Sequence, residues 1–311
     1  MRSKRVADMS GKSVPQNLAL SNPGKILFPK SGFTKANLAD YYQQASPIIL
    51  PHLKDRPLMI QRFPEGINSE GFYQKEVVGH FPAWISRVRL KKKEGGYIEQ
   101  AMANNRSTLL YIADLAGITL HPWLSRADRP DLPDRVLFDL DPAGDRGDFP
   151  LVIRTAGMLR TLLGRIGLRP YVMTTGSRGL HVAAPLLRKE SFEQVRAFAL
   201  EVAQRLVGEH PDVLTTEQRI AKRGGRLYLD VTRNGYGQTS VAPYAVRALP
   251  GAPVATPLEW SELTASGLGP QSFNLGNILT RLDQQPDPWQ GMGRHGRSLA
   301  QARRNLQNLA D

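Results

Sequence analysis

The sequence contains no cysteine, which excludes a disulfide framework, a thiolate nucleophile and a zinc ribbon. It has no long uninterrupted apolar run and no signal-peptide pattern in residues 1–21, so we expect a cytoplasmic protein without a membrane association. Acidic residues are few: 28 Asp and Glu stand against 41 Lys and Arg, which gives a formal net charge of +13. This excess predicts a polyanionic partner, and nucleic acid is the first candidate.

The segment Val136–Pro142 alternates apolar and acidic residues and predicts a strand that projects Asp139 and Asp141 from one face. Two carboxylates on one face repel each other unless a cation or a shared proton offsets the repulsion. Hard oxygen ligands suit Mg²⁺ or Mn²⁺, and two such ions serve phosphoryl transfer. Asp230, in the strand expected at Arg226–Val231, would complete a set of three carboxylates. A lone Asp-x-Asp alternatively marks a solvated strand end.

A second pattern predicts a strand, a turn of small residues and another strand within Tyr171–Val182. Glycines in the turn allow a close backbone approach to a phosphate, and the guanidinium of Arg178 offers a charged fork. The Gly-Lys-Ser/Thr ending of a P-loop is missing. An ordinary hairpin is the alternative, but Ser-Arg-Gly-x-His, which ends at His181, favours a triphosphate cradle.

Near the start, Thr34 is a plausible N-cap for a helix over Lys35–Ala45. Lys35 would then lie in the first turn, which suits a phosphate at the helix N-terminus. A solvated lysine is the alternative, and spacing alone favours it.

Three further features each have two interpretations. Phe72 and Tyr73, followed by Lys75, lie in a glycine-flanked context; core packing is slightly favoured over a stacking platform for unpaired bases. Residues 91–93 are all lysine and precede paired glycines, which predicts an exposed hairpin tip. His121 precedes a proline, and a lone histidine there is more often structural than catalytic.

The remaining periodicities predict further elements. Helices are expected at 107–116, 149–164, 192–208 and 275–282, and strands at 57–63, 84–90 and 240–247. Strands and helices in this mixed order predict an α/β or α+β fold with a mixed central sheet flanked by helices in a single compact domain. Residues 1–20 are expected to form a flexible basic tail, and residues 293–311 a basic arm or helix.

Five ordered phrases resemble the polymerase module of bacterial ligase D, within the archaeo-eukaryotic primase superfamily. They are Asn22-Pro23-Gly24-Lys25, Leu120-His121-Pro122-Trp123-Leu124-Ser125-Arg126, Phe138-Asp139-Leu140-Asp141-Pro142, Gly179-Leu180-His181-Val182 and Val241-Ala242-Pro243-Tyr244. The resemblance covers about residues 21–292 and implies a primase-like polymerase domain there, with its part 21–135 packed on a catalytic core at 136–292. The family's turn usually reads Ser-Gly-Gly-Lys-Gly-Leu-His, whereas this chain has Thr175, Ser177 and Arg178 at the first, third and fourth positions.

The resemblance implies a polymerase that adds nucleotides, preferentially ribonucleotides, to a primer 3′-hydroxyl at DNA gaps and breaks. Two Mn²⁺ or Mg²⁺ ions would be held by Asp139, Asp141 and Asp230, with His121 also required in the active site. The nucleoside triphosphate would contact Thr175, Ser177, Arg178, Gly179, His181, Gln238 and Arg247. A downstream 5′-phosphate would contact Lys25 and Lys35, and the template would stack near Phe72, Tyr73 and Lys75. Loops near Lys91–Arg106 and Thr215–Arg226 would align two broken ends, with Lys92, Lys93, Lys222 and Arg223 as their cations.

The same resemblance implies partners and leaves rivals. We expect a monomeric module excised from a larger ligase, which works on the bacterial nucleoid beside ligase and phosphoesterase domains and the Ku end-binding protein. A stand-alone primase-polymerase is the nearest alternative. A metal-dependent nuclease would use the same carboxylates but needs no triphosphate cradle. A non-catalytic end-binding module would have no use for the clustered carboxylates, which would repel the DNA phosphates and weaken binding.

Overall fold

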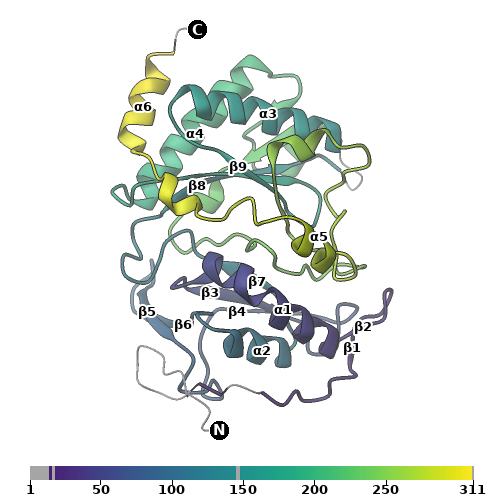
Figure 1. The fold of residues 1–311 in the computed structure, drawn as a ribbon. Helices are drawn as coiled ribbons and strands as arrows, with labels where there is room; N and C mark the ends of the chain where they lie inside the picture. The colour runs from purple at the N-terminus through teal and green to yellow at the C-terminus, as the bar shows by residue number, and fades with distance from the viewer. Residues whose placement is uncertain (1–13, 16–17, 145–147, 310–311) are drawn as a thin grey trace. The chain divides into compact units, whose positions relative to one another are not determined.

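The computed structural model describes residues 14–15, 18–144 and 148–309, and the chain divides into two compact units (Figure 1). The first unit contains residues up to Trp123 together with 241–254 and 274–283. The second contains 124–240, 255–273 and the residues from 284 onward. The residues expected to form the tail, 1–20, lie largely outside the described part of the chain. The expected packing of part 21–135 on the core stays a prediction.

The second unit is built on a six-stranded sheet whose order is β11-β12-β8-β10-β9-β13. Strand β8 is central and pairs antiparallel with both β10 and β12. The β11–β12 pair is parallel, which makes the sheet mixed as expected. The bounds are β8 (Arg135–Asp141), β9 (Tyr171–Thr174), β10 (Leu180–Pro185), β11 (Leu214–Thr215), β12 (Leu227–Asp230) and β13 (Pro257–Leu258).

Helices α3 (Phe149–Arg165), α4 (Phe192–Glu209) and α6 (Leu299–Gln307) belong to the same unit. Their buried apolar residues share one core with Phe138 and Leu140 of β8, and both of these side chains are fully buried. Burial stabilises each such side chain by about 1.5–3 kcal/mol. Because strand side chains alternate, the acidic residues of β8 project from the opposite face. The expected alternation is therefore confirmed, as are the three helices in this unit.

The first unit contains small sheets and helices. The sheets are β1 (Ile26–Phe28) with β2 (Phe33–Thr34), the order β4-β3-β7 with bounds Phe72–Gln74, Leu58–Arg62 and Gly117–Pro122, and β5 (Arg87–Lys91) with β6 (Tyr97–Ala101). The helices are α1 (Lys35–Leu53), α2 (Arg106–Asp114) and α5 (Ile278–Gln284). Short 3₁₀-helices in the second unit are η1 (Ile220–Lys222), η2 (Thr232–Asn234), η3 (Trp260–Thr264) and η4 (Met292–His295).

Helix α1 begins where the sequence predicts and ends later. The Thr34 side chain caps it by accepting a hydrogen bond from the Asn37 amide at 3.3 Å. The expected end at Ala45 is wrong, since the helix continues through Pro47. A proline has no N–H to donate to the carbonyl four residues back. Here the Ser46 hydroxyl donates to that carbonyl, which belongs to Gln43, at 2.9 Å.

The expected strand at 240–247 is wrong. Tyr244 has φ 63°, in the left-handed region and outside the extended conformation of a strand. This segment is held instead by tertiary contacts of its own unit: the Tyr41 hydroxyl donates to the Tyr244 carbonyl at 2.7 Å, and the Ala242 amide donates to the Leu120 carbonyl.

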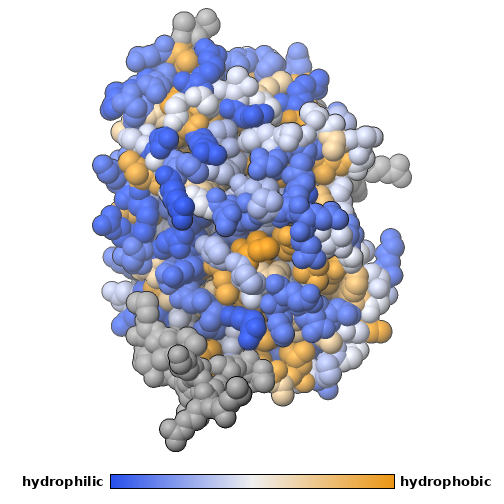
Figure 2. Space-filling view, viewed as in Figure 1, coloured by the Kyte–Doolittle hydropathy of each residue, from blue (hydrophilic) through white to orange (hydrophobic). Residues whose placement is uncertain are grey.

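Hydrophilic residues cover most of the face drawn in Figure 2. Within the described ranges, no helix combines the length and apolar character needed to cross a membrane. At the C-terminal end, the expected arm or helix is the helix α6, whose Arg303 forms a two-bond ion pair with Glu201 of α4 at 2.8 and 2.9 Å.

Candidate active site

Asp139 lies between two polar side chains on one face of the six-stranded sheet. Across the β8–β12 ladder its partner is Asp230, and across the β8–β10 ladder its partner is His181. Residues directly opposite in antiparallel strands have neighbouring side chains on the same face. The His181 Nε2 atom lies 3.5 Å from an oxygen of Asp139. The sequence-predicted carboxylates therefore come together with the histidine of the predicted cradle.

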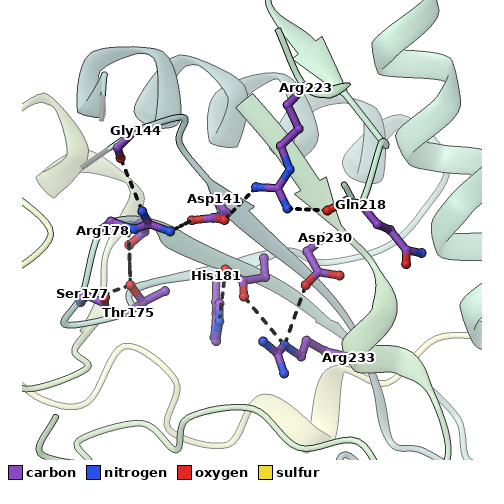
Figure 3. Close-up of polar contacts among 12 residues, drawn as sticks. Asp141, Gly144, Thr175, Ser177, Arg178, His181, Gln218, Arg223, Asp230 and Arg233 are labelled. Carbon is purple, nitrogen blue, oxygen red and sulfur yellow. Dashed lines mark hydrogen bonds and ion pairs between the residues drawn. The ribbon is translucent and has the colours of Figure 1, made fainter. Parts of the chain in front are cut away.

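Asp141 is engaged by two arginines from different loops (Figure 3). Arg178 contacts one carboxylate oxygen at 2.8 Å and Arg223 contacts the other at 3.1 Å. The Arg223 guanidinium also lies 4.1 Å from the centre of the Tyr228 ring, and it donates to the carbonyls of Glu217 and Gln218. Positive charge thus offsets the repulsion between the carboxylates.

Asp230 is the most buried of the three carboxylates and is fixed by its neighbours. One of its oxygens accepts hydrogen bonds from the Tyr228 hydroxyl at 3.2 Å and the Thr232 amide at 2.7 Å. Burial and the negative charge of Asp230 raise the pKa of Tyr228 well above its usual value. The phenol therefore remains a donor at neutral pH. The other oxygen of Asp230 lies 3.8 Å from Arg233.

The donor set suits a hard divalent cation, because all three side chains offer carboxylate oxygens from one sheet face. As the side chains stand, however, no three His, Asp or Glu residues in the described part of the chain converge closely enough to hold an ion. Both oxygens of Asp141 are taken by guanidinium groups. An ion bound by Asp139, Asp141 and Asp230 would either share the Asp141 oxygens with these guanidinium groups or displace one of them.

The turn between β9 and β10 is held from within by Thr175. Its hydroxyl donates to the Gly179 carbonyl at 3.1 Å and accepts from the amides of Ser177 and Gly179 at 3.2 and 3.3 Å. Gly176 takes the left-handed conformation with φ 63°, whereas Ser177 has no positive φ, so the side chain of Ser177 adds no backbone strain. A Cβ on Gly179 would lie 1.9 Å from the Leu140 carbonyl oxygen. The glycine thus lets the turn approach the acidic strand directly.

The other residues predicted to act at the active site lie outside the β9–β10 turn. Gln238 is exposed in the turn that follows η2. Arg247 and His121 belong to the first unit, where His121 lies on β7 opposite Met59. The rings of Tyr73 and His121 are arranged edge to face, with 6.0 Å between their centres. The roles of these residues stay predictions.

Lys25 and Lys35 lie at the β1–β2 corner, and each has an acidic neighbour. Lys25 Nζ contacts Glu65 at 2.8 Å, and Lys35 Nζ contacts Asp114 at 3.4 Å. Lys35 is 5% exposed, so the alternative of a solvated lysine is wrong. The Lys35 amide donates to the Lys25 carbonyl, and the next amide, of Ala36, donates to Pro23. Since these helix amides are occupied, a phosphate here would be held by side chains.

Phe72 and Tyr73 are 48% and 52% exposed on the edge strand β4. The favoured interpretation as core residues is therefore wrong, because both rings are about half exposed to solvent. The Arg62 guanidinium lies 5.1 Å from the centre of the Phe72 ring. Lys75 follows the two rings and is also exposed. The pair is available for stacking.

The predicted end-alignment cations lie on two exposed turns. Lys92 and Lys93 are exposed in the turn of the β5–β6 hairpin, where Lys92 accepts from Gly95 and donates to Gly96 through its backbone. Lys222 is exposed in η1. Arg223 instead reaches the carboxylate of Asp141, a contact that the sequence did not predict.

Arg233 is the functional candidate that sequence reasoning missed. Its Nε atom lies 3.9 Å from Asp139 and 3.8 Å from Asp230. The available signal was its position three residues after Asp230, at the start of a turn. A second missed residue is the fully buried Asn234, whose amide bonds both the N–H and the C=O of Leu137 at 2.8 and 2.6 Å. Asn234 thereby fixes the strand that carries the acidic residues.

Comparison with known proteins gives a consistent set of similarities. The profile of the family described as LigD, primase-polymerase domain, matches residues 34–289. The chain is 31% identical over 274 residues to the multifunctional non-homologous end joining protein LigD of Mycolicibacterium smegmatis, covering 88% of this chain and 35% of that protein. It is 30% identical over 280 residues to the bifunctional non-homologous end joining protein LigD of Bacillus subtilis, covering 89% of this chain and 44% of that protein.

A solved structure has the same fold. The polymerase domain of Mycobacterium tuberculosis ligase D, in complex with DNA, superposes with a TM-score of 0.83 at 28% identity. The match covers 91% of this chain and 100% of that one. The chain spans only about a third of the length of the mycobacterial relative.

Proposed function

Since this chain belongs to the family of LigD primase-polymerase domains, we propose that it is a nucleotidyltransferase that extends a primer 3′-hydroxyl at gaps and broken ends of DNA. One observation carries the proposal: Asp139, Asp230 and His181 are direct neighbours across three strands, and the Thr175–Gly179 turn touches the same strand. A nuclease has no need of that turn.

Asp139, Asp141 and Asp230 would hold Mn²⁺ or Mg²⁺ ions, which lower the pKa of an attacking hydroxyl and stabilise a leaving pyrophosphate. The chain's own residues orient the substrates. Arg178 lies in the β9–β10 turn, and its side chain is about half exposed. Its guanidinium can release Asp141 and bind two phosphate oxygens instead.

His181 and Arg233 lie on the same side of the sheet as the carboxylates. Both can donate to the anionic oxygens of a triphosphate and hold it against the acidic strand. Gln238, Arg247 and His121 are proposed as further contacts on the strength of the family resemblance. The enzyme forms no covalent intermediate, because the primer hydroxyl itself is the nucleophile.

The DNA contacts are proposed from surface features and, for the two lysines, from the family resemblance. The exposed rings of Phe72 and Tyr73 would stack on template bases, and Lys25 and Lys35 would contact a downstream 5′-phosphate. The exposed basic turns with Lys92, Lys93 and Lys222 would align two ends. We further propose a monomer that acts on the bacterial nucleoid beside ligase and phosphoesterase domains and Ku. The net charge of +13 supports a polyanionic partner.

The test is the length of a labelled primer incubated with DNA, metal and nucleotide. A polymerase lengthens the primer only when nucleotide is present. Shortening without nucleotide would instead establish a nuclease, and unchanged length with tight binding would establish a non-catalytic binding module. Synthesis of a new strand on a template without primer would favour a stand-alone primase.

A further inference from the structure

Two segments of the second unit contain bases but no acids. Residues 149–189 include seven Arg and Lys residues and no Asp or Glu, and residues 288–309 include four Arg residues and no Asp or Glu. Opposite charges within a segment usually compensate each other on a protein surface. Where two such segments meet in the fold, their arginines have no acidic neighbour from either one.

The two segments contact each other at the start of β9. The Tyr171 hydroxyl lies 2.7 Å from Nδ1 of His295. The Trp289 indole donates to a carbonyl of β9 at 3.0 Å, and the Leu187 amide donates to the Arg297 carbonyl at 2.8 Å. The C-terminal segment, yellow in Figure 1, is thereby fixed to β9 and to the residues that follow β10.

Three arginines surround His295 at this contact. The Arg169 guanidinium lies 5.6 Å from the centre of the Tyr171 ring, and Arg294 and Arg297 flank the histidine in the chain. All three side chains are exposed, and none of them forms an ion pair with another residue in the described ranges. We call these three arginines and His295 the arginine cluster.

His295 experiences the positive potential of the cluster. Partial desolvation and, after it, the charges of the three arginines lower the pKa of His295. Glu259 is close enough to act on Tyr171, whose pKa is raised by burial. The phenol therefore stays protonated at neutral pH and can donate to Nδ1 of His295. The neutral imidazole then carries its proton on Nε2, where it is a further donor for an anion.

The backbone that carries the cluster is held in place before any partner binds. Trp289 is 2% exposed and anchors the segment beside β9. The Arg294 amide donates to a carbonyl of its own turn at 2.9 Å, and the Arg297 amide donates to the Pro185 carbonyl at 3.2 Å. Binding would therefore order side chains alone, which keeps its entropic cost low.

The cluster lies at the other end of β9 from the candidate triphosphate turn. Tyr171 is the first residue of this strand, and Thr175 follows its last residue. Four residues of extended strand separate the Cα atoms of Tyr171 and Thr175 by about 13 Å. Substitutions in the cluster consequently leave the turn and the acidic strand as they are.

We propose that the arginine cluster binds the phosphate backbone of a DNA duplex outside the catalytic site. Guanidinium forks match the geometry of phosphate oxygens. An acidic protein segment suits the surface less well, because protein interfaces have an apolar centre. Of the large apolar side chains that are exposed in the described part of the chain, Leu187 alone belongs to the two segments. The role requires a DNA partner but no polymerase chemistry.

The test is equilibrium binding of a fluorescent continuous duplex, followed by anisotropy over a series of NaCl concentrations without metal or nucleotide. Each phosphate contact contributes about 0.9 to the slope of log Kd against log salt. Arg294→Gln combined with Arg297→Gln should therefore lower the slope by about 2 and raise the Kd on the order of tenfold at low salt. Both side chains are exposed, so the fold should be preserved.

Arg154→Gln combined with Arg196→Gln is the matched control. These exposed arginines lie on α3 and α4, and the control removes the same net charge. It should leave the slope and the Kd near those of the wild type. Both double variants should fill a gap at the wild-type rate when DNA is saturating, because neither changes a residue proposed for catalysis.

Equal effects of the two double variants on the slope, or no effect of either, would overturn the role of the cluster. Tighter binding of a polyglutamate peptide than of the duplex at equal salt would also overturn it, since the surface would then suit an acidic protein partner. The proposed function can fail separately. If the wild type incorporates no nucleotide but the cluster variant still weakens duplex binding, the polymerase proposal fails and the role of the cluster stands.

Discussion

Arg223 and Asp141 form an ion pair of 3.1 Å between residues 82 positions apart in the sequence. The pair joins a basic loop to the acidic strand. The Arg223 side chain packs over the Tyr228 ring, and its partner is one of the three carboxylates proposed to hold metal. Any ion that binds Asp141 therefore competes with the loop that contains Arg223.

We accordingly expect Arg223→Ala to bind Mn²⁺ more tightly. Removing a competing pair of about 0.2–1 kcal/mol should lower the Kd by a factor of about 1.4 to 5. Calorimetric titration with Mn²⁺ measures the change directly. Arg219→Ala is the control, because Arg219 is exposed on the same loop and removes an equal charge. Equal effects from both variants would show that net charge, and not the contact with Asp141, governs the affinity.

Two glycine substitutions should change stability in opposite directions. A Cβ at Gly179 would lie 1.9 Å from the Leu140 carbonyl oxygen, so Gly179→Ala should destabilise the protein by about 1–3 kcal/mol or more. A Cβ at Gly157, inside α3, would meet no neighbouring atom within 4 Å, and Gly157→Ala should stabilise by ~1 kcal/mol. Urea unfolding gives both free energies. Similar values for the two variants would refute the close approach of the turn to β8.

The stability of the protein should fall in alkaline solution. Burial raises the pKa of Tyr41 and Tyr42, and burial together with Asp230 raises the pKa of Tyr228. The folded state thus favours the protonated phenols. The stability linked to them is complete below the ordinary tyrosine pKa of about 10 and is lost as the pH rises above it.

The urea midpoint should therefore be level near neutral pH and decline above about pH 10. Tyr41→Phe should lessen the decline, although it also removes the hydrogen bond to the Tyr244 carbonyl. Tyr97→Phe, at a ring that is 55% exposed, should leave the pH dependence unchanged. A decline of the same size in all three proteins would assign it to other groups.

The sequence predicts the elements that local pattern determines. Period-two alternation is sufficient to place Asp139 and Asp141 on one face, because a strand has no other way to bury Phe138 and Leu140. The turn at Thr175 is predictable for a similar reason, since Gly176 takes the left-handed conformation and Gly179 leaves no room for a Cβ.

Features that depend on distant residues could not be predicted in this way. Nothing local to Lys35 indicates that Ser21 and Asp114 will enclose it. The residues around Tyr244 have the pattern of a strand. In the structure, however, the Tyr244 backbone is left-handed and its carbonyl accepts a hydrogen bond from the Tyr41 hydroxyl. The arginine partners of Asp141 come from loops on either side of it, and only the folded chain brings them together.

The most direct test of the account is single-nucleotide incorporation into a one-nucleotide gap with a 5′-phosphate, in Mn²⁺, by the wild type and by Asp139→Asn. This substitution keeps the side chain's shape and removes the charge at the centre of the three-strand cluster. Asp148→Asn is the control, because it removes the same charge from the N-cap of α3 and asparagine caps a helix equally well. We predict that Asp139→Asn slows incorporation on the order of 10³-fold while the Kd for gapped DNA stays within about twofold, and that Asp148→Asn behaves as the wild type. Incorporation by Asp139→Asn at the wild-type rate would contradict the central claim that these carboxylates form the catalytic site.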